Sequence, residues 1–233
     1  MAEAAPRVAM LAGATGLVGS SVLEALLDTP DFGRVFAITR RPLGREHPKL
    51  ANRIVQWDKV EAQLRGLSCH VAFCCLGTTL RQAGSPEEFR KIDLGYVLAF
   101  AAAAKAAQAQ RFVVVSSVGA DASSKNFYLR TKGEMENAVA AVGFPAVDIL
   151  QPSLLLGWRR QMRPLELGAI VAAPIINPFL FGSREIYRGI PARTVAAAMI
   201  GAVRSGRKGV QRYTHSAIQA LARLKAPRTP AAA

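Results

Sequence analysis

The sequence predicts an α/β fold with a doubly wound, mainly parallel sheet, and three observations support this prediction. Short β-rich runs alternate with longer helical patterns before residue 150, as in strand–helix–strand units. Most of these runs are apolar throughout, which is typical of strands covered by helices on both faces. The first run leads through a glycine-rich loop into a helical pattern. Together these features predict a fold of the Rossmann type.

The expected strands are short, mostly apolar and without alternation. A further strand is expected late in the chain, around Gly209–Tyr213. In chain order, the earlier ones are Arg7–Ala12, Arg34–Thr39, Arg53–Gln56, His70–Cys74, Arg111–Ser116 and Ala146–Leu150.

The expected helices fall between these strands. Leu17–Asp28 follows the glycine loop, and a short turn or helix follows Asp58. Pro86–Ala107 begins with proline in its first turn, beside acidic residues that the helix dipole favours. Tyr128–Val142 ends at Gly143, a residue suited to the left-handed conformation that ends a helix.

The length of 233 residues fits one domain better than two. We expect a single domain over residues 1–233, with its core in residues 5–150. The alternation weakens after that, and residues 151–233 are expected to add further helices, including Thr194–Ser205. We expect this small C-terminal extension to cover the carboxyl end of the sheet as a substrate-capping part, since ligands of such folds bind there.

The cysteines and the apolar segments bear on the compartment. The three cysteines are an odd number, and Cys74 and Cys75 are adjacent, which argues against a disulfide framework and predicts a reducing cytoplasm. No signal peptide is evident at the start of the sequence. The apolar stretch Leu167–Gly182 is too short and too interrupted by prolines to span a bilayer. A buried helix, a pocket wall or a subunit contact is expected there.

The chain is strongly basic, with 30 Lys and Arg against 16 Asp and Glu, a net charge of +14. Such a balance attracts polyanions in general. The basic residues are nevertheless scattered, without long runs or interleaved aromatic residues. We therefore expect a solvated basic surface rather than a specific nucleic-acid site.

The glycine loop gives the strongest functional signal. Gly13, Gly16 and Gly19 follow the first strand at a spacing of three and open the first helix. The first glycine permits a tight turn, the second allows close approach of a pyrophosphate, and the third allows helix and strand to pack closely. The N–H groups at the helix start would then bind the phosphates of a dinucleotide.

The end of the second strand indicates which dinucleotide is bound. Arg40 and Arg41 stand where an NAD site would carry an acid for the ribose 2′-hydroxyl. Guanidinium groups bind phosphate oxygens by charge-assisted hydrogen bonds, so the pair favours NADP(H). The alternative is two solvated arginines in a basic protein. Asp58, after the third strand, is expected either to border the adenine or to cap the next helix.

Two further segments predict the reactive end of the site. Gly77 and Thr78, after the fourth strand, are expected beside the cofactor ribose. Tyr128 and Lys132 share one face of a helix, downstream of a serine-bearing strand end. An ammonium group near a phenol favours the phenolate and makes tyrosine a usable acid–base group. The alternative is a structural pair on a helix surface.

No metal site is expected, because His47, His70 and His215 are far apart and lack ligand spacing. Hydrolysis by a Ser-His-Asp triad is also not supported, because the G-x-S-x-G motif is absent.

These residues together resemble the short-chain dehydrogenase/reductase superfamily, and in particular its atypical branch, that of the Tat-interacting oxidoreductase-like protein and its bacterial relatives. The resemblance runs through GATGLVG, TRRP, FCCLGTT, SSVGAD, YLRTKGEME and LQPSLLLG. It implies the following roles. The pyrophosphate would be held by Gly13, Thr15, Gly16, Leu17, Val18 and Gly19, and the 2′-phosphate by Arg40 and Arg41. The ribose would be contacted by Leu76, Gly77, Thr78 and Lys132, and the nicotinamide amide by Pro152 and Ser153. The catalytic trio would consist of Ser117, Tyr128 and Lys132.

The resemblance leaves two functions open. One is an NADP(H)-dependent oxidoreductase that acts on the carbonyl or alcohol of an apolar small molecule. The other is a regulatory protein that senses NADPH by binding it, without physiological turnover. The part after the sixth strand is short for the epimerase-like branch, which argues against a sugar-nucleotide substrate. A homodimer or another protein partner is expected only by analogy with the superfamily.

Overall fold

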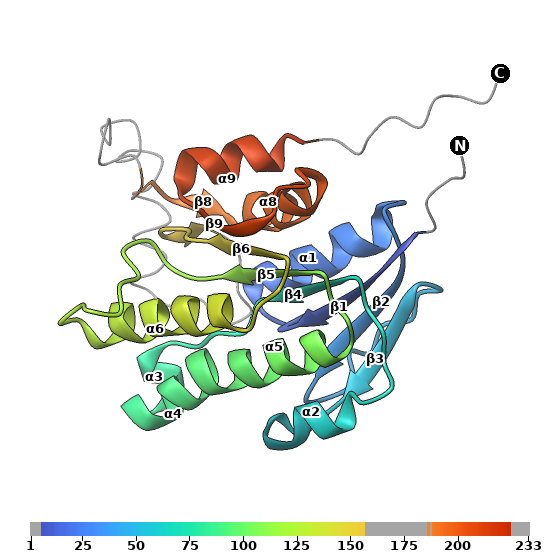
Figure 1. Cartoon of the computed structure of the whole chain (residues 1–233), viewed down its shortest axis with the longest axis horizontal. Helices are drawn as coiled ribbons and strands as arrows, with labels where there is room; N and C mark the ends of the chain where they lie inside the picture. The colour runs from blue at the N-terminus through green and yellow to red at the C-terminus, as the bar shows by residue number, and fades with distance from the viewer. Residues whose placement is uncertain (1–5, 157–185, 187, 225–233) are drawn as a thin grey trace.

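The computed structural model describes residues 6–156, 186 and 188–224, and its main feature is a seven-stranded parallel sheet. The strand order is β3-β2-β1-β4-β5-β6-β9 (Figure 1). The chain reverses its direction of travel across the sheet between β1 and β4, which opens a crevice at their carboxyl ends. The strands are β1 Arg7–Ala12, β2 Phe32–Thr39, β3 Leu50–Ile54, β4 Val71–Cys74, β5 Arg111–Val115, β6 Ala146–Leu150 and β9 Gly209–Tyr213. This sheet confirms the predicted fold class.

Helices cover both faces of the sheet. In Figure 1, α1, α8 and α9 lie above it, and α2, α5 and α6 lie below it. Each layer closes its own apolar core, with Leu26 and Met199 in the upper core and Phe100 and Met135 in the lower one. The helices are α1 Leu17–Asp28, α2 Val60–Gln63, α3 Leu80–Ala83, α4 Pro86–Arg90, α5 Val97–Ala106, α6 Phe127–Ala141, α8 Ala192–Arg204 and α9 His215–Ala222.

The sequence was least informative at β3. The expected strand Arg53–Gln56 lies three residues earlier, at Leu50–Ile54, where it pairs with Val35–Thr39 of β2. This strand is at the edge of the sheet and is only partly buried, so it lacks the apolar run on which the prediction depended.

The long helix expected over Pro86–Ala107 is interrupted. It forms α4, then a π-helical segment over Lys91–Tyr96, and then α5. A π-helical turn inserts an extra residue into the helical repeat and often marks a functional site. Here it turns Asp93 into the interior, where that residue is fully buried.

The C-terminal part of the described chain extends the sheet and its upper helical layer. β9 pairs in parallel with β6, and α8 packs against α1 and α9. β7 (Leu155–Leu156) and β8 (Ile190–Pro191) form a separate parallel pair. Residues 157–185 of the expected capping part lie outside the described residues, and so does the apolar stretch Leu167–Gly182. Among the residues that the structure describes, no helix is long and apolar enough to cross a membrane.

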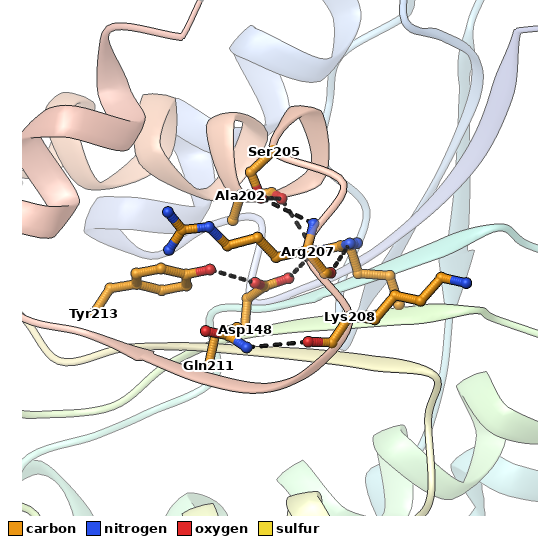
Figure 2. Close-up of polar contacts among 8 residues, drawn as sticks. Asp148, Ala202, Ser205, Arg207, Lys208, Gln211 and Tyr213 are labelled. Carbon is orange, nitrogen blue, oxygen red and sulfur yellow. Dashed lines mark hydrogen bonds and ion pairs between the residues drawn. The ribbon is translucent and has the colours of Figure 1, made fainter.

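A buried polar cluster joins β9 to the rest of the sheet. The Tyr213 hydroxyl donates to Asp148 Oδ1 on β6 at 3.0 Å, as Figure 2 shows. Arg111 of β5 donates to Asp148 Oδ2 at 2.5 Å and to the carbonyl of Ala202, near the end of α8, at 3.0 Å. The same guanidinium donates to the carbonyl of Arg207. The buried carboxylate thus has both a charge partner and hydrogen-bond donors, as burial of a charge requires.

Candidate cofactor and catalytic site

Two adjoining pockets lie at the carboxyl edge of the sheet, where β1 and β4 end. The first has a volume of about 420 Å³ and the second about 410 Å³. The predicted site residues that line the first are Gly13, Thr15, Gly16, Arg40, Arg41, Leu76, Gly77 and Thr78. Those that line the second are Gly16, Leu17, Val18, Leu76, Gly77, Thr78, Tyr128 and Lys132. The shared residues make the two pockets halves of one groove.

Packing requires a glycine at two of the three glycine positions of the loop. Gly13 has φ +83°, and a Cβ there would lie 2.4 Å from the carbonyl oxygen of Cys75. A Cβ on Gly19 would lie 2.0 Å from the carbonyl oxygen of Gly13. Both glycines are therefore required by the packing of the protein. A Cβ on Gly16 would lie 3.4 Å from the carbonyl oxygen of Gly13, an ordinary contact, so packing alone does not require this glycine.

The start of α1 faces this groove. Gly16 is the N-cap, no side chain caps the helix, and the first turn carries no acidic residue. The first N–H groups of a helix have no partner within the helix, and the dipole makes that end positive. This end of α1 is therefore suited to bind an anion such as a pyrophosphate.

The arginine pair is exposed at the outer end of the groove. Arg40 and Arg41 directly follow β2 and line the first pocket. Asn52 of β3 fixes this loop, because its side-chain amide donates to Thr39 Oγ1 at 2.7 Å and its Oδ1 accepts from the N–H of Leu43 at 3.0 Å. Asn52 could not be found from the sequence, since only the pairing of β2 with β3 shows that it reaches this loop.

An aromatic wall borders the first pocket. Trp57 and Tyr96 line the pocket and stack on each other, with ring centroids 5.8 Å apart. Asp58 is exposed, lines neither pocket and forms an ion pair with Lys91 at 3.4 Å. Its side chain does not cap a helix in the described structure. A contact between Asp58 and adenine stays a prediction.

Tyr128 and Lys132 both face the second pocket from α6. Lys132 is buried, and its Nζ lies 2.6 Å from Oδ1 of Asp93, which is also buried and lines the pocket. Burial pulls the pKa of Lys132 down, but the negative charge of Asp93, with smaller help from Tyr128, leaves it above its ordinary value. Asp93 was missed because a regular helix over Pro86–Ala107 gives no reason to turn it inward.

The two adjacent serines differ in their surroundings. Ser116 is buried, lines the second pocket, and has a hydroxyl without a hydrogen-bond partner among the described residues. Ser117, the predicted catalytic serine, lines neither pocket, and its hydroxyl lies 3.4 Å from the carbonyl oxygen of Val118. A catalytic role for Ser117 stays a prediction, while the pocket geometry favours Ser116.

Pro152 and Ser153 follow β6 but line neither pocket. The carbonyl of Pro152 accepts from the N–H of Val118 at 3.0 Å, and the Ser153 hydroxyl donates to the carbonyl of Arg188. The nearby Leu155 does line the second pocket. The predicted contact of Pro152 and Ser153 with the nicotinamide amide stays a prediction.

Burial disfavours the reactive thiolate form of the three cysteines. Burial raises the pKa of Cys69 and of Cys74 to about 12 and that of Cys75 well above its ordinary value. A thiol is reactive mainly as the thiolate, so these cysteines are poor nucleophiles at neutral pH. Within the described residues, no group of His, Cys, Asp or Glu side chains could hold a metal ion.

The strand order, the glycine loop and the groove across the switch point define a Rossmann-type nucleotide-binding domain. Comparison with known proteins narrows this class. The chain belongs to the NAD(P)H-binding family, whose model matches residues 13–157.

Two relatives illustrate the family. Protein FMP52-1, mitochondrial, from Scheffersomyces stipitis is 34% identical over 197 residues, which cover 82% of this chain and 85% of the relative. Protein HTATIP2 from Rattus norvegicus is 38% identical over 158 residues, which cover 66% of this chain and 65% of the relative. The expected membership of the atypical short-chain dehydrogenase/reductase branch is thereby confirmed.

Solved structures confirm the fold. Human epimerase family protein SDR39U1 with NADPH gives a TM-score of 0.60 at 17% identity, covering 89% of this chain and 74% of that one. The Bordetella bronchiseptica enzyme WbmF with NAD⁺ gives 0.66 at 16% identity, covering 94% and 77%. These neighbours include both NAD⁺ and NADPH complexes, so they do not indicate which of the two coenzymes this chain binds.

The expected cytoplasmic location is contradicted. Fungal relatives from several species, including Debaryomyces hansenii and Candida albicans, are named mitochondrial proteins, which points away from the cytoplasm. The error has a chemical cause, because unpaired cysteines indicate a reducing environment without choosing among the compartments that provide one.

Proposed function

We propose that the protein is an NADP(H)-dependent oxidoreductase of the short-chain dehydrogenase type, acting on the carbonyl or alcohol of an apolar small molecule. The observation that carries the proposal is the single groove with Arg40 and Arg41 at one end and Tyr128 and Lys132 at the other. A dinucleotide laid across Gly16 would bring its adenosine half to the arginines and its nicotinamide half to the tyrosine.

The charge of the first pocket supports the phosphorylated coenzyme. Arg40 and Arg41 are exposed, and no acidic side chain lines the first pocket among the described residues. A 2′-phosphate there would form charge-assisted bonds with the guanidinium groups without repulsion from a carboxylate. The indole of Trp57 and the ring of Tyr96 provide a flat apolar wall beside it.

The second pocket supports acid–base chemistry on an oxygen atom. When bound, the coenzyme supplies or accepts the hydride. Tyr128 would transfer a proton to or from the substrate oxygen, and Lys132 would hold the ribose and stabilise the phenolate. A serine hydroxyl would orient the same oxygen. The predicted residue for this role is Ser117, and the pocket geometry favours Ser116.

The lining of the second pocket supports an apolar substrate. Leu17, Leu80, Val115 and Leu155 surround the polar group of Tyr128 and Lys132. Leu80 is a large apolar side chain that remains 42% exposed at this pocket. An apolar ligand that covered it would remove this surface from water.

A regulatory binding protein is the second candidate, and one observation favours it. Asp93 lies 2.6 Å from the Lys132 ammonium and offsets the positive charge that would stabilise a Tyr128 phenolate. A site arranged in this way can hold a coenzyme while having less acid–base power.

Coenzyme choice is tested by calorimetry with NADPH and NADH on the wild type and on the Arg40→Ala and Arg41→Ala variants. Arg45→Ala is the matched control, because Arg45 lies in the same loop but lines neither pocket. We expect each pocket variant to weaken NADPH binding at least ~10-fold, with little change for NADH and no effect of the control. Tighter binding of NADH than of NADPH to the wild type would refute the assignment.

Turnover is tested by NADPH oxidation with a panel of apolar aldehydes and ketones. We expect activity that Tyr128→Phe reduces by roughly 100-fold or more, because the proton donor is removed. Activity that survives this change would refute the role of the tyrosine. Tight NADPH binding without any turnover would favour the regulatory candidate.

A further inference from the structure

Asp93 is a fully buried carboxylate to which the proposed chemistry assigns no role. It lies in the π-helical segment Lys91–Tyr96 and lines the second pocket. A buried ionised carboxylate is costly unless a charge partner and hydrogen-bond donors compensate it. The position of this carboxylate at the pocket therefore has to be explained by the groups that contact it.

Both carboxylate oxygens are used. Oδ1 lies 2.6 Å from Nζ of Lys132 on α6, and Oδ2 accepts the backbone N–H of Thr78 at 2.8 Å. Gly77 lies against this ion pair, since a Cβ there would be in ordinary contact with Asp93 Oδ1 at 3.4 Å and Lys132 Nζ at 3.7 Å. One side chain thus connects α6, the loop after β4 and the π-helical segment.

The surroundings of Lys132 explain why a charge is needed at this position. Its side chain is only 6% exposed, and burial by itself favours the neutral amine. The titratable groups that act on it are Asp93 from the π-helical segment, Cys74 from the end of β4, and Tyr128 on its own helix. Of these, Asp93 favours the charged form of Lys132 most strongly.

We propose that Asp93 is a positioning residue for coenzyme binding, which holds the Lys132 ammonium charged and directed at the groove and fixes the Thr78 backbone beside it. This inference rests on the proposed coenzyme function. It extends the site to a residue that does not itself contact the reacting atoms.

The substitution Asp93→Asn isolates the charge. Asparagine keeps an oxygen that can accept the Thr78 N–H, but it removes the negative charge facing Lys132. The buried amine would then release its proton at a lower pH. A neutral Lys132 attracts the anionic coenzyme less strongly, so coenzyme binding acquires a pH dependence that the wild type lacks.

The experiment is calorimetry with NADPH between pH 7.5 and 9.5 on the wild type, Asp93→Asn and Glu136→Gln. Glu136 is the matched control: it is a buried carboxylate on α6 that accepts from Gln151 at 2.8 Å and Arg212 at 2.9 Å, and it lines neither pocket. We expect the affinity of Asp93→Asn to fall at least ~10-fold across this range, while the other two proteins stay nearly constant.

A pH dependence of Asp93→Asn that parallels the wild type would overturn the inference and leave the proposed function standing. No binding of NADPH to the wild type would overturn the proposed function, and the inference with it.

A second measurement on the wild type needs no folded Asp93→Asn protein. In spectra of protein labelled with ¹³C at lysine Cε, and assigned with Lys132→Arg, we expect the Lys132 signal to titrate at no lower pH than the signals of the exposed lysines. A titration midpoint clearly below theirs would overturn the inference.

Discussion

Alanine substitutions at Gly16 and Gly19 distinguish a glycine needed for coenzyme binding from a glycine needed for folding. Gly16 has φ −79° and ψ 172°, a conformation open to alanine, and an added Cβ would lie 3.4 Å from the Gly13 carbonyl oxygen. We therefore expect Gly16→Ala to change the free energy of unfolding by less than about 1 kcal/mol. At Gly19 the new Cβ would lie 2.0 Å from the carbonyl oxygen of Gly13, and we expect a loss of about 1–3 kcal/mol.

For coenzyme binding we expect the opposite order, with the substitution at Gly16 having the larger effect. Gly16 lines both pockets, at the point where a pyrophosphate would approach the backbone. We expect Gly16→Ala to weaken NADPH binding at least ~10-fold, or about 1.4 kcal/mol, in a protein that still folds normally.

Urea unfolding and calorimetry on the same preparations measure both quantities. Wild-type affinity in Gly16→Ala would refute the reading of the loop as a pyrophosphate site. A collapse of stability in this variant would show that packing, rather than a ligand, requires the glycine.

Three other predictions follow from the buried polar groups. Ser116→Ala should lower turnover of a carbonyl substrate more than Ser117→Ala, because only the Ser116 hydroxyl lies at the pocket; the opposite order in steady-state kinetics would restore the original assignment. All three thiols should react slowly with a disulfide reagent at pH 8 in the native protein and quickly in urea, because burial keeps them protonated, and a fast native phase would contradict this. Burial, and then the charge of Asp148, raise the pKa of Tyr213 to about 12, so the native state keeps a proton that the unfolded state releases near pH 10. Stability should therefore fall between about pH 10 and 12, and Tyr213→Phe should lose less stability over that range; equal losses in denaturant titrations would count against the argument.

Local sequence patterns predicted most of the sheet. Apolar runs gave the bounds of β1 and β6 because both strands are buried in the sheet, and the late strand was placed correctly. The same signal failed at β3, where the strand at the sheet edge carries polar side chains such as Asn52 and Arg53. Periodicity also predicted one helix over Pro86–Ala107, because a π-helical turn depends on tertiary packing and leaves no mark in the spacing of apolar residues.

The candidate site was predicted where it follows the chain and missed where it depends on contacts between distant segments. The glycine loop, the arginine pair and the Tyr128–Lys132 pair each lie within one short stretch of sequence. Asp93 reaches the pocket only because the helix is interrupted, and Asn52 reaches the arginine loop only through strand pairing. The choice between Ser116 and Ser117 likewise depends on how the chain turns after β5, which their adjacency in the sequence does not reveal.

The polar cluster around Asp148 bears on how the chain completes its fold. β9 follows the other six strands of the sheet in the chain, and it joins the sheet at its edge by pairing with β6. A shift by one residue would move Tyr213 to the opposite face and take its hydroxyl away from the carboxylate. The loss of this hydrogen bond to a buried carboxylate oxygen would penalise that arrangement, so the cluster favours the correct docking of the last strand. A chain that ended before β9 would present the Asp148 strand as an open edge, ready to pair with another molecule.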